Sequence, residues 1–157
     1  MRGIFDLASP PDLLAKLRRE YKRFRGAPDD ADHAFNFFVT AEHMLDWLHP
    51  GSSGEPRRRA VRTSDPLLET VSHLANGAKH FDRLKPHHKA VSDTTRRGGW
   101  FGRHYFAKGY FAREYFAEPT LVVKLSGAAA AKFGSSVTAI ALAGHVLVYW
   151  SAPGRVQ

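Results

Sequence analysis

The sequence predicts a mainly α-helical protein, a compact bundle of about four helices with a small β-hairpin before the last helix. Apolar side chains recur at helical spacing through much of residues 10–81, and capping residues and prolines stand where helices would begin. A run rich in β-branched residues occurs only later, at 119–125. The chain has 157 residues, of which 43% are hydrophobic, so we expect a single domain over 1–157 with a buried core.

The first predicted helix spans residues 10–25. Ser9 can cap this helix, and Pro10 and Pro11 suit its first turn. One face is apolar and the other is cationic, as in an amphipathic surface helix. The apolar face comprises Leu13, Leu14, Leu17, Tyr21 and Phe24, and the cationic face comprises Lys16, Arg18, Arg19, Lys22, Arg23 and Arg25.

A second helix is predicted for residues 30–48. Its apolar face, which includes Phe35 and Phe38, is so wide that we expect the helix to be central and largely buried. Asn36, Thr40 and His43 form a polar line along it. Because buried polar groups need partners, this line should face another polar element, a water site or the surface.

Residues 50–64 are predicted to form a basic loop. Glycine, serine and proline dominate its first part, and the arginine run follows at once. A solvated loop is one interpretation, and a loop that contacts phosphate groups is the other. The arginines are Arg57, Arg58, Arg59 and Arg62.

The third predicted helix begins near Asp65 and Pro66 and extends to about residue 81. It also carries a polar line beside its apolar face. Two packed helices with polar lines imply either a hydrogen-bond network that fixes their register or a pocket for a small anion or nucleotide. The residues of this predicted polar pocket are Asn36, His43, His73, Asn76, Lys79 and His80.

Residues 85–117 are predicted to form a long aromatic and basic loop. An aromatic pair followed by a small residue occurs there every five positions, beginning at Trp100, Tyr105, Tyr110 and Tyr115. Such pairs would cover every side of a helix and both faces of a strand. We expect an irregular segment, with base stacking and self-association as alternative roles. The predicted binding surface comprises Arg57, Arg58, Arg59, Trp100, Arg103, Tyr105, Tyr110, Arg113 and Tyr115.

The last third of the chain predicts a β-hairpin at 119–134 and then a helix. Thr120 to Leu125 has strong strand propensity, and Gly127 can turn the chain into a returning strand. Residues 137–151 are interpreted as the last helix. A second hairpin turning at Gly144 and His145 is the alternative, because the residues that follow favour a strand.

Two motifs resemble those of a widespread family of uncharacterised bacterial proteins. Residues 34–43 with Trp47 are similar to the central helix of that family, and residues 73–81 (HLANGAKHF) are similar to its most recognisable motif. Val91, Thr94 and Trp150 continue the resemblance, which covers nearly the whole chain. It implies a last helix over 137–151 and, more distantly, a HEPN-type helical domain.

The HEPN resemblance implies a ribonuclease as an alternative function. Active members of that superfamily are metal-independent RNases with an arginine and a histidine separated by four to six residues. Histidine can transfer the proton and arginine can hold the phosphate. Two pairs have this spacing here, Arg83 with His88 and Arg97 with His104.

The charge of the chain favours polyanionic partners. Its formal net charge is +8, so we expect contact with RNA or DNA, with a protein partner or homo-oligomer as the other candidates. The chain has no cysteine, no signal peptide is evident and no run is long enough to cross a membrane. We therefore expect a bacterial cytoplasmic binding module without a metal or cofactor. A structural self-associating subunit is a further alternative.

Overall fold

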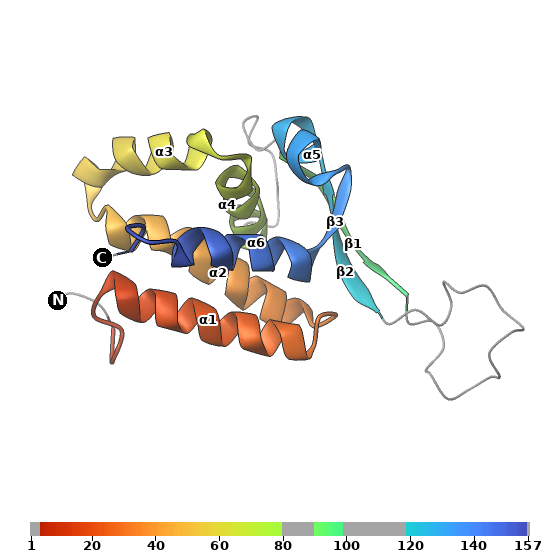
Figure 1. Ribbon diagram of the computed structural model, residues 1–157, viewed down its shortest axis with the longest axis horizontal. Helices are drawn as coiled ribbons and strands as arrows, with labels where there is room; N and C mark the ends of the chain where they lie inside the picture. Colours follow the sequence, from red (N-terminus) through yellow and green to blue (C-terminus); the bar gives the residue numbers. More distant parts are fainter. Residues whose placement is uncertain (1–3, 80–89, 99–118, 157) are drawn as a thin grey trace, which may run out of the picture.

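The computed structural model describes residues 4–79, 90–98 and 119–156, and the side chains of Ala78 and Lys79 are outside this description. Helices occupy one part of the molecule and a three-stranded sheet lies at the other end of its long axis (Figure 1). The chain is mainly helical, as predicted, but the arrangement of its β-strands differs from the prediction.

Helices α1 (Pro10–Gly26), α2 (Ala31–Leu48) and α6 (Ala139–Ser151) pack together. The predicted apolar face of α1 is confirmed, since Leu17 and Phe24 are fully buried. Ser9 caps α1 through its hydroxyl, and Asp30 caps α2 by accepting from the Asp32 and His33 amides. The helix predicted over 137–151 is present from residue 139 onward, residues 136–138 form a strand, and the alternative hairpin is wrong.

Helix α2 buries most of the apolar face expected from the sequence, with Phe35 as an exception. Phe37 and Met44 are fully buried, whereas Phe35, assigned to the core from the sequence, is 46% exposed. Thr40 of the polar line is buried and accepts a hydrogen bond from Lys16 Nζ at 3.0 Å. The polar line thus contributes to the contact between α1 and α2.

The predicted basic loop at 50–64 is wrong for most of its length. A short 3-10 turn, η1 (Ser52–Gly54), leads into α3 (Glu55–Ser64), which has Pro56 in its first turn. Proline at this position needs no amide donor and is preset for a helix. Val61 packs against the core, so α3 is held by tertiary contacts as well as by its own turns. Helix α4 (Pro66–Lys79) follows directly.

The predicted hairpin at 119–134 is correct for its first strand and wrong for its returning strand. β2 (Thr120–Leu125) is the central strand, paired antiparallel with β1 (Val91–Arg97) on one side and β3 (Ser136–Thr138) on the other. Between β2 and β3 lies α5 (Gly127–Phe133), where a returning strand was expected. Four consecutive alanines give this segment high helix propensity. Lys132 of α5 also forms an ion pair with Asp65 at 2.8 Å, which fixes the helix to the start of α4.

Strand β1 lies within the region predicted as irregular, so that prediction is wrong for residues 91–97. The aromatic repeat at 100–116 lies outside the described residues. Within the described ranges, no helix has the length and apolar content that crossing a bilayer requires.

Candidate functional site

Helix α1 carries a large share of the positive charge. Its six lysines and arginines against two acids give it a net charge of +4, half of the +8 of the whole chain. Glu20, one of the two acids, is buried and contacts Lys16 Nζ at 2.8 Å and Arg23 Nη1 at 3.0 Å. Burial opposes ionisation of Glu20, but the hydrogen bonds and charges of these two cations outweigh it and lower its pKa.

The other cations of α1 point to solvent. Arg18, Arg19, Lys22 and Arg25 are exposed, and we call them the α1 cationic face. Arg18 donates a hydrogen bond to the Ser151 hydroxyl at 3.4 Å. Within the described part of the chain, Arg19, Lys22 and Arg25 have no acidic partner. Their spacing of three residues places neighbouring members on adjacent turns of one helical surface.

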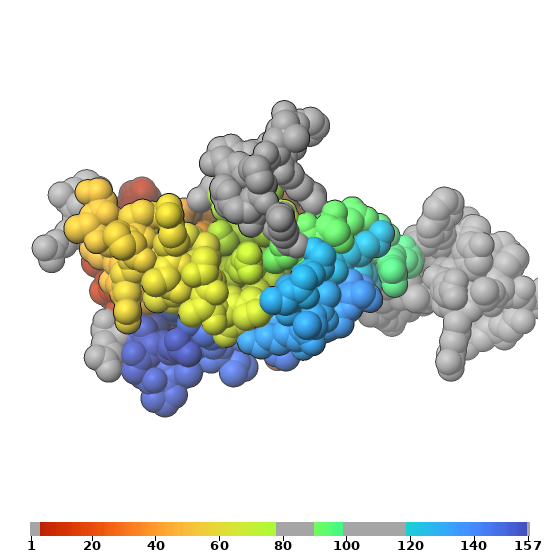
Figure 2. Space-filling view, turned by 90° about the horizontal axis from the view of Figure 1, so that it is seen from above, coloured from red at the N-terminus to blue at the C-terminus, as the bar shows by residue number. Residues whose placement is uncertain are grey.

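Helix α3 offers fewer available cations than its arginine run suggests. Arg58 forms ion pairs with Asp46 at 3.3 Å and Glu55 at 2.8 Å, and it donates to two backbone carbonyls of the preceding turn. Arg57 and Arg59 are exposed. α1 and α3 lie on opposite sides of α2 and α6 (Figure 1), and α1 (red) is almost hidden when α3 (yellow) faces the viewer (Figure 2). The two basic surfaces are therefore separate.

A polar network joins α2, α3 and α4. Arg62 Nε and Nη2 donate to Glu42 Oε1 at 3.0 and 2.8 Å, and Ser72 also hydrogen-bonds to Glu42. Asn76 Nδ2 donates to the Ser72 carbonyl at 2.8 Å and lies 3.3 Å from its hydroxyl. Burial raises the pKa of Glu42 and outweighs the opposing effects of Arg62 and Ser72. We interpret this network as a structural connection, because its polar groups are used within it.

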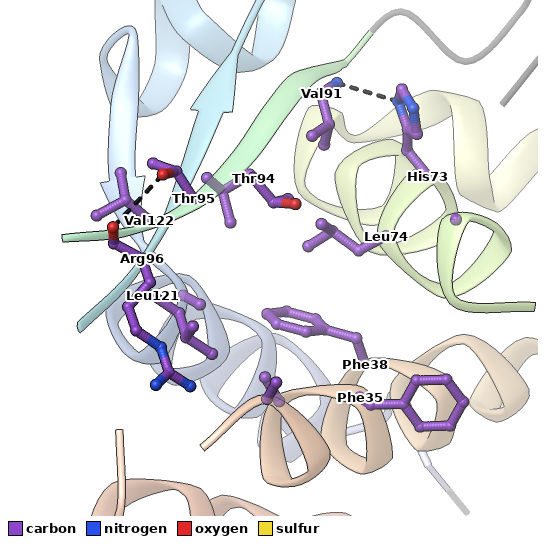
Figure 3. Close-up of a pocket in the computed structure, with 15 residues that line it drawn as sticks. Phe35, Phe38, His73, Leu74, Val91, Thr94, Thr95, Arg96, Leu121 and Val122 are labelled. Atoms are coloured by element: carbon purple, nitrogen blue, oxygen red, sulfur yellow. Dashed lines mark hydrogen bonds between the residues drawn. The ribbon is translucent and has the colours of Figure 1, made fainter. Parts of the chain in front are cut away.

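A cavity of about 350 Å³ lies between α2, α4 and the sheet, with the start of α6 at one side (Figure 3). Its walls are mostly apolar, with Phe38, Leu74, Val91, Leu121 and Val122 among them. The polar residues that line it are His73, Thr94, Thr95 and Arg96. This combination of apolar walls and a few polar groups is typical of small-molecule sites.

Small residues on the two helices create the space. Ala31 and Ala34 of α2 and Gly77 of α4 line the cavity, so a methyl group or a hydrogen stands where a larger side chain would fill it. Leucine at these positions would project into the cavity. The cavity thus depends on these three small residues. Two of them, Ala31 and Ala34, lie near the start of α2, which Asp30 caps.

A β-bulge aims the strand residues at the cavity. The register of β1 against β2 shifts between Val91 and Asp93, so an extra residue interrupts the alternation of the side chains. Val91, Thr94 and Arg96 all line the cavity as a result. Thr94 lies between β1 and α4, while Arg96 extends along the edge toward the start of α2 (Figure 3). Arg96 Nη2 donates to the Asp29 carbonyl at 2.8 Å.

His73 is buried and connects α4 to β1. The Val91 amide donates to His73 Nδ1 at 3.0 Å, the contact drawn as a dashed line in Figure 3. An amide can only donate, so Nδ1 carries no proton while this bond exists, and the ring proton is on Nε2. The histidine therefore has a structural role at one wall of the cavity.

Of the residues predicted from the sequence to form a polar pocket, His73 lines the observed cavity. Asn36 is exposed, and Asn76 bonds within its own helix. His43 does not line the cavity, and the Lys79 side chain and His80 lie outside the described residues. Arg96 was missed as a cavity residue, because no local pattern reveals which strand face meets a helix.

The other predicted site residues are mostly outside the described ranges. Arg83, His88 and His104 of the ribonuclease pairs lie there, and Arg97 is exposed at the end of β1. The ribonuclease hypothesis therefore stays a prediction. The aromatic part of the predicted binding surface is likewise outside the description, namely Trp100, Arg103, Tyr105, Tyr110, Arg113 and Tyr115.

Comparisons with known proteins give no relative for this chain. Neither a scan against protein-family models nor searches of curated proteins and of solved structures finds a match.

Proposed function

We propose that this protein is an RNA-binding module whose α1 cationic face contacts phosphate groups. The observation that carries the proposal is the set of exposed cations Arg19, Lys22 and Arg25, which have no acidic partner within the described part of the chain. Arg18 lies beside them. Arginine and lysine bind phosphate oxygens through charge-assisted hydrogen bonds.

The geometry of α1 supports binding along a strand of nucleic acid. A helix rises about 1.5 Å per residue, so the cationic face from Arg18 to Arg25 extends about 10 Å, enough to contact two or three successive phosphates. The helix cannot turn this face inward, because its other side is buried against α2 and α6. The resemblance to HEPN-type domains, whose active members act on RNA, favours RNA over DNA.

The test is the salt dependence of binding to a fluorescein-labelled single-stranded RNA, measured by fluorescence anisotropy. We expect affinity to fall steeply as NaCl increases, because each phosphate contact releases counterions. The double variant Arg19→Gln/Lys22→Gln should weaken binding at low salt. It should also reduce the slope of log K against log salt by about 1.4, or about 0.7 for each lost contact.

The matched control is Arg57→Gln/Arg59→Gln, which removes the same charge from exposed positions of α3. This control should leave the slope nearly unchanged. If both double variants reduce binding equally, net charge rather than the α1 cationic face is responsible. If the unmodified protein does not bind RNA at low salt, the proposed function is wrong.

A further inference from the structure

We infer that the cavity between α2, α4 and the sheet binds a small amphipathic carboxylate. The apolar chain of this ligand would lie between Phe38 and Leu74, and its carboxylate would meet Arg96 and Thr94. This site is separate from the α1 cationic face. It is independent of the proposed RNA binding and can be tested without it.

The size and walls of the cavity suit such a ligand. About 350 Å³ falls within the range of about 300–1,000 Å³ that small-molecule sites occupy. Phe38 and Leu74 face this space from two helices, and Leu121 faces it from the sheet (Figure 3). An apolar chain placed there would leave water and contact apolar surfaces on several sides, which is favourable in proportion to the buried area.

One end of the cavity is cationic. Among the residues that the structure describes, Arg96 uses one of its five N–H groups on the Asp29 carbonyl, so its guanidinium can still donate to an anion. Thr94, two residues before it on β1, adds a hydroxyl on the same side of the strand. An arginine fork matches the two oxygens of a carboxylate, and a neighbouring hydroxyl can donate a third hydrogen bond.

The surrounding charges favour a singly charged ligand. Asp30 lies near Arg96, and its Oδ1 atom accepts from the amides of Asp32 and His33 at the start of α2. This carboxylate offsets part of the Arg96 charge, which disfavours a dianion such as a phosphate monoester. His73 is held to β1 through Nδ1. Among the described lining residues, Arg96 is thus the permanent cation.

The first test is isothermal titration calorimetry of the full chain with sodium decanoate below its micelle concentration. We expect saturable binding of one decanoate per chain. Arg96→Gln should weaken binding about tenfold, the loss expected for one charge-assisted contact. Arg59→Gln removes the same charge from α3, outside the cavity lining, and should leave the affinity within about twofold.

The second test fills the cavity. Ala34→Leu should abolish decanoate binding, and Ala31→Leu, at an exposed position at the cavity edge, should weaken it without disturbing the core. Ala141→Leu is the control, because Ala141 is exposed on α6 and does not line the cavity. Far-ultraviolet circular dichroism identifies the variants that fold.

The outcomes distinguish the proposal from nonspecific binding. Loss of binding in a folded Ala34→Leu or Ala31→Leu variant, with Ala141→Leu unaffected, supports it. The proposal is wrong if the unmodified protein shows no decanoate binding at millimolar concentration. Equal weakening by Arg96→Gln and Arg59→Gln would also overturn it, because decanoate would then respond only to net charge.

Discussion

Two buried glutamates show how local partners decide the state of a carboxyl group. Glu20 contacts two cations, and their combined effect exceeds the cost of burial, so its pKa is lowered. Glu42 contacts Arg62 and Ser72, but burial dominates and its pKa is raised. Ionised Glu20 therefore stabilises the folded protein. For Glu42, folding favours the protonated carboxyl group over the ionised one.

The raised pKa of Glu42 predicts a pH-dependent effect of removing Arg62. The contribution of Glu42 to the free energy of unfolding is greatest when the pH is below the pKa of Glu42 in the unfolded chain. This contribution decreases as the pH rises through the raised pKa of Glu42 in the folded protein. Arg62→Gln raises that folded pKa further. We therefore expect this variant to lose about 2–3 kcal/mol at pH 7, less than a fully buried pair would lose because Arg62 is partly exposed. Urea unfolding at several pH values measures the loss.

The loss in Arg62→Gln should become smaller as the pH falls from 7 to a lower value at which Glu42 binds a proton. Glu42→Gln is the matched control, since its side chain has a similar shape and does not titrate. Adding Arg62→Gln to Glu42→Gln should cost nearly the same at both pH values. A pH-independent loss in the single Arg62→Gln variant would contradict the assignment of a raised pKa to Glu42.

At the scale of elements, the turn between α2 and α3 depends on a missing side chain. A Cβ atom on Gly54 would collide with the backbone carbonyl of His49. The backbone angles of Gly54 are ordinary, with φ at −78°, so the restriction is steric and not conformational. The close approach positions α3 so that Arg62 reaches Glu42.

Gly54→Ala should therefore destabilise the protein, by about 1–3 kcal/mol as is typical of added atoms in tightly packed places. Gly26→Ala provides the control, because a Cβ atom there meets nothing within 4 Å and alanine favours the last turn of α1. Thermal unfolding followed by circular dichroism compares the two. Similar midpoints for both variants would show that the turn can move.

The helices were largely predictable because their signals are local. Ser9, Asp30 and Pro66 mark starts that the structure has within one residue of the prediction. α3 was missed because the arginine run indicates solvent, although Pro56 and the residues after it are compatible with a helix. Its stability comes from Val61 and Arg62, whose partners are far away in the sequence.

The cavity was not predictable because it depends on tertiary structure. Its residues come from five separate segments, and neither the bulge near Val91 nor the space beside Ala34 follows from a local pattern.

The cationic residues of α1 were identified from the sequence. What the sequence did not reveal was that Lys16 and Arg23 share Glu20 while Arg19 and Lys22 have no acidic partner in the described part.

At the scale of the whole molecule, charge is distributed unevenly. α1 has a net charge of +4, and neighbouring cations on it repel one another. We expect the thermal unfolding midpoint to rise as NaCl increases from about 20 mM to about 500 mM, because the Debye length shortens over this range. Arg19→Gln/Lys22→Gln should unfold at a higher temperature at low salt and respond less to NaCl. A midpoint that falls with salt would contradict this expectation.

The packing of α6 against α1 has a consequence for synthesis on the ribosome. Leu142 and Val146 of α6 complete the core around Leu17 and Phe24 of α1, although the chain between them is more than a hundred residues long. A nascent chain that ends before residue 139 lacks the part of the cover over the apolar face of α1 that α6 supplies. Domains generally fold as units during translation, so this core closes only after the last helix has left the exit tunnel.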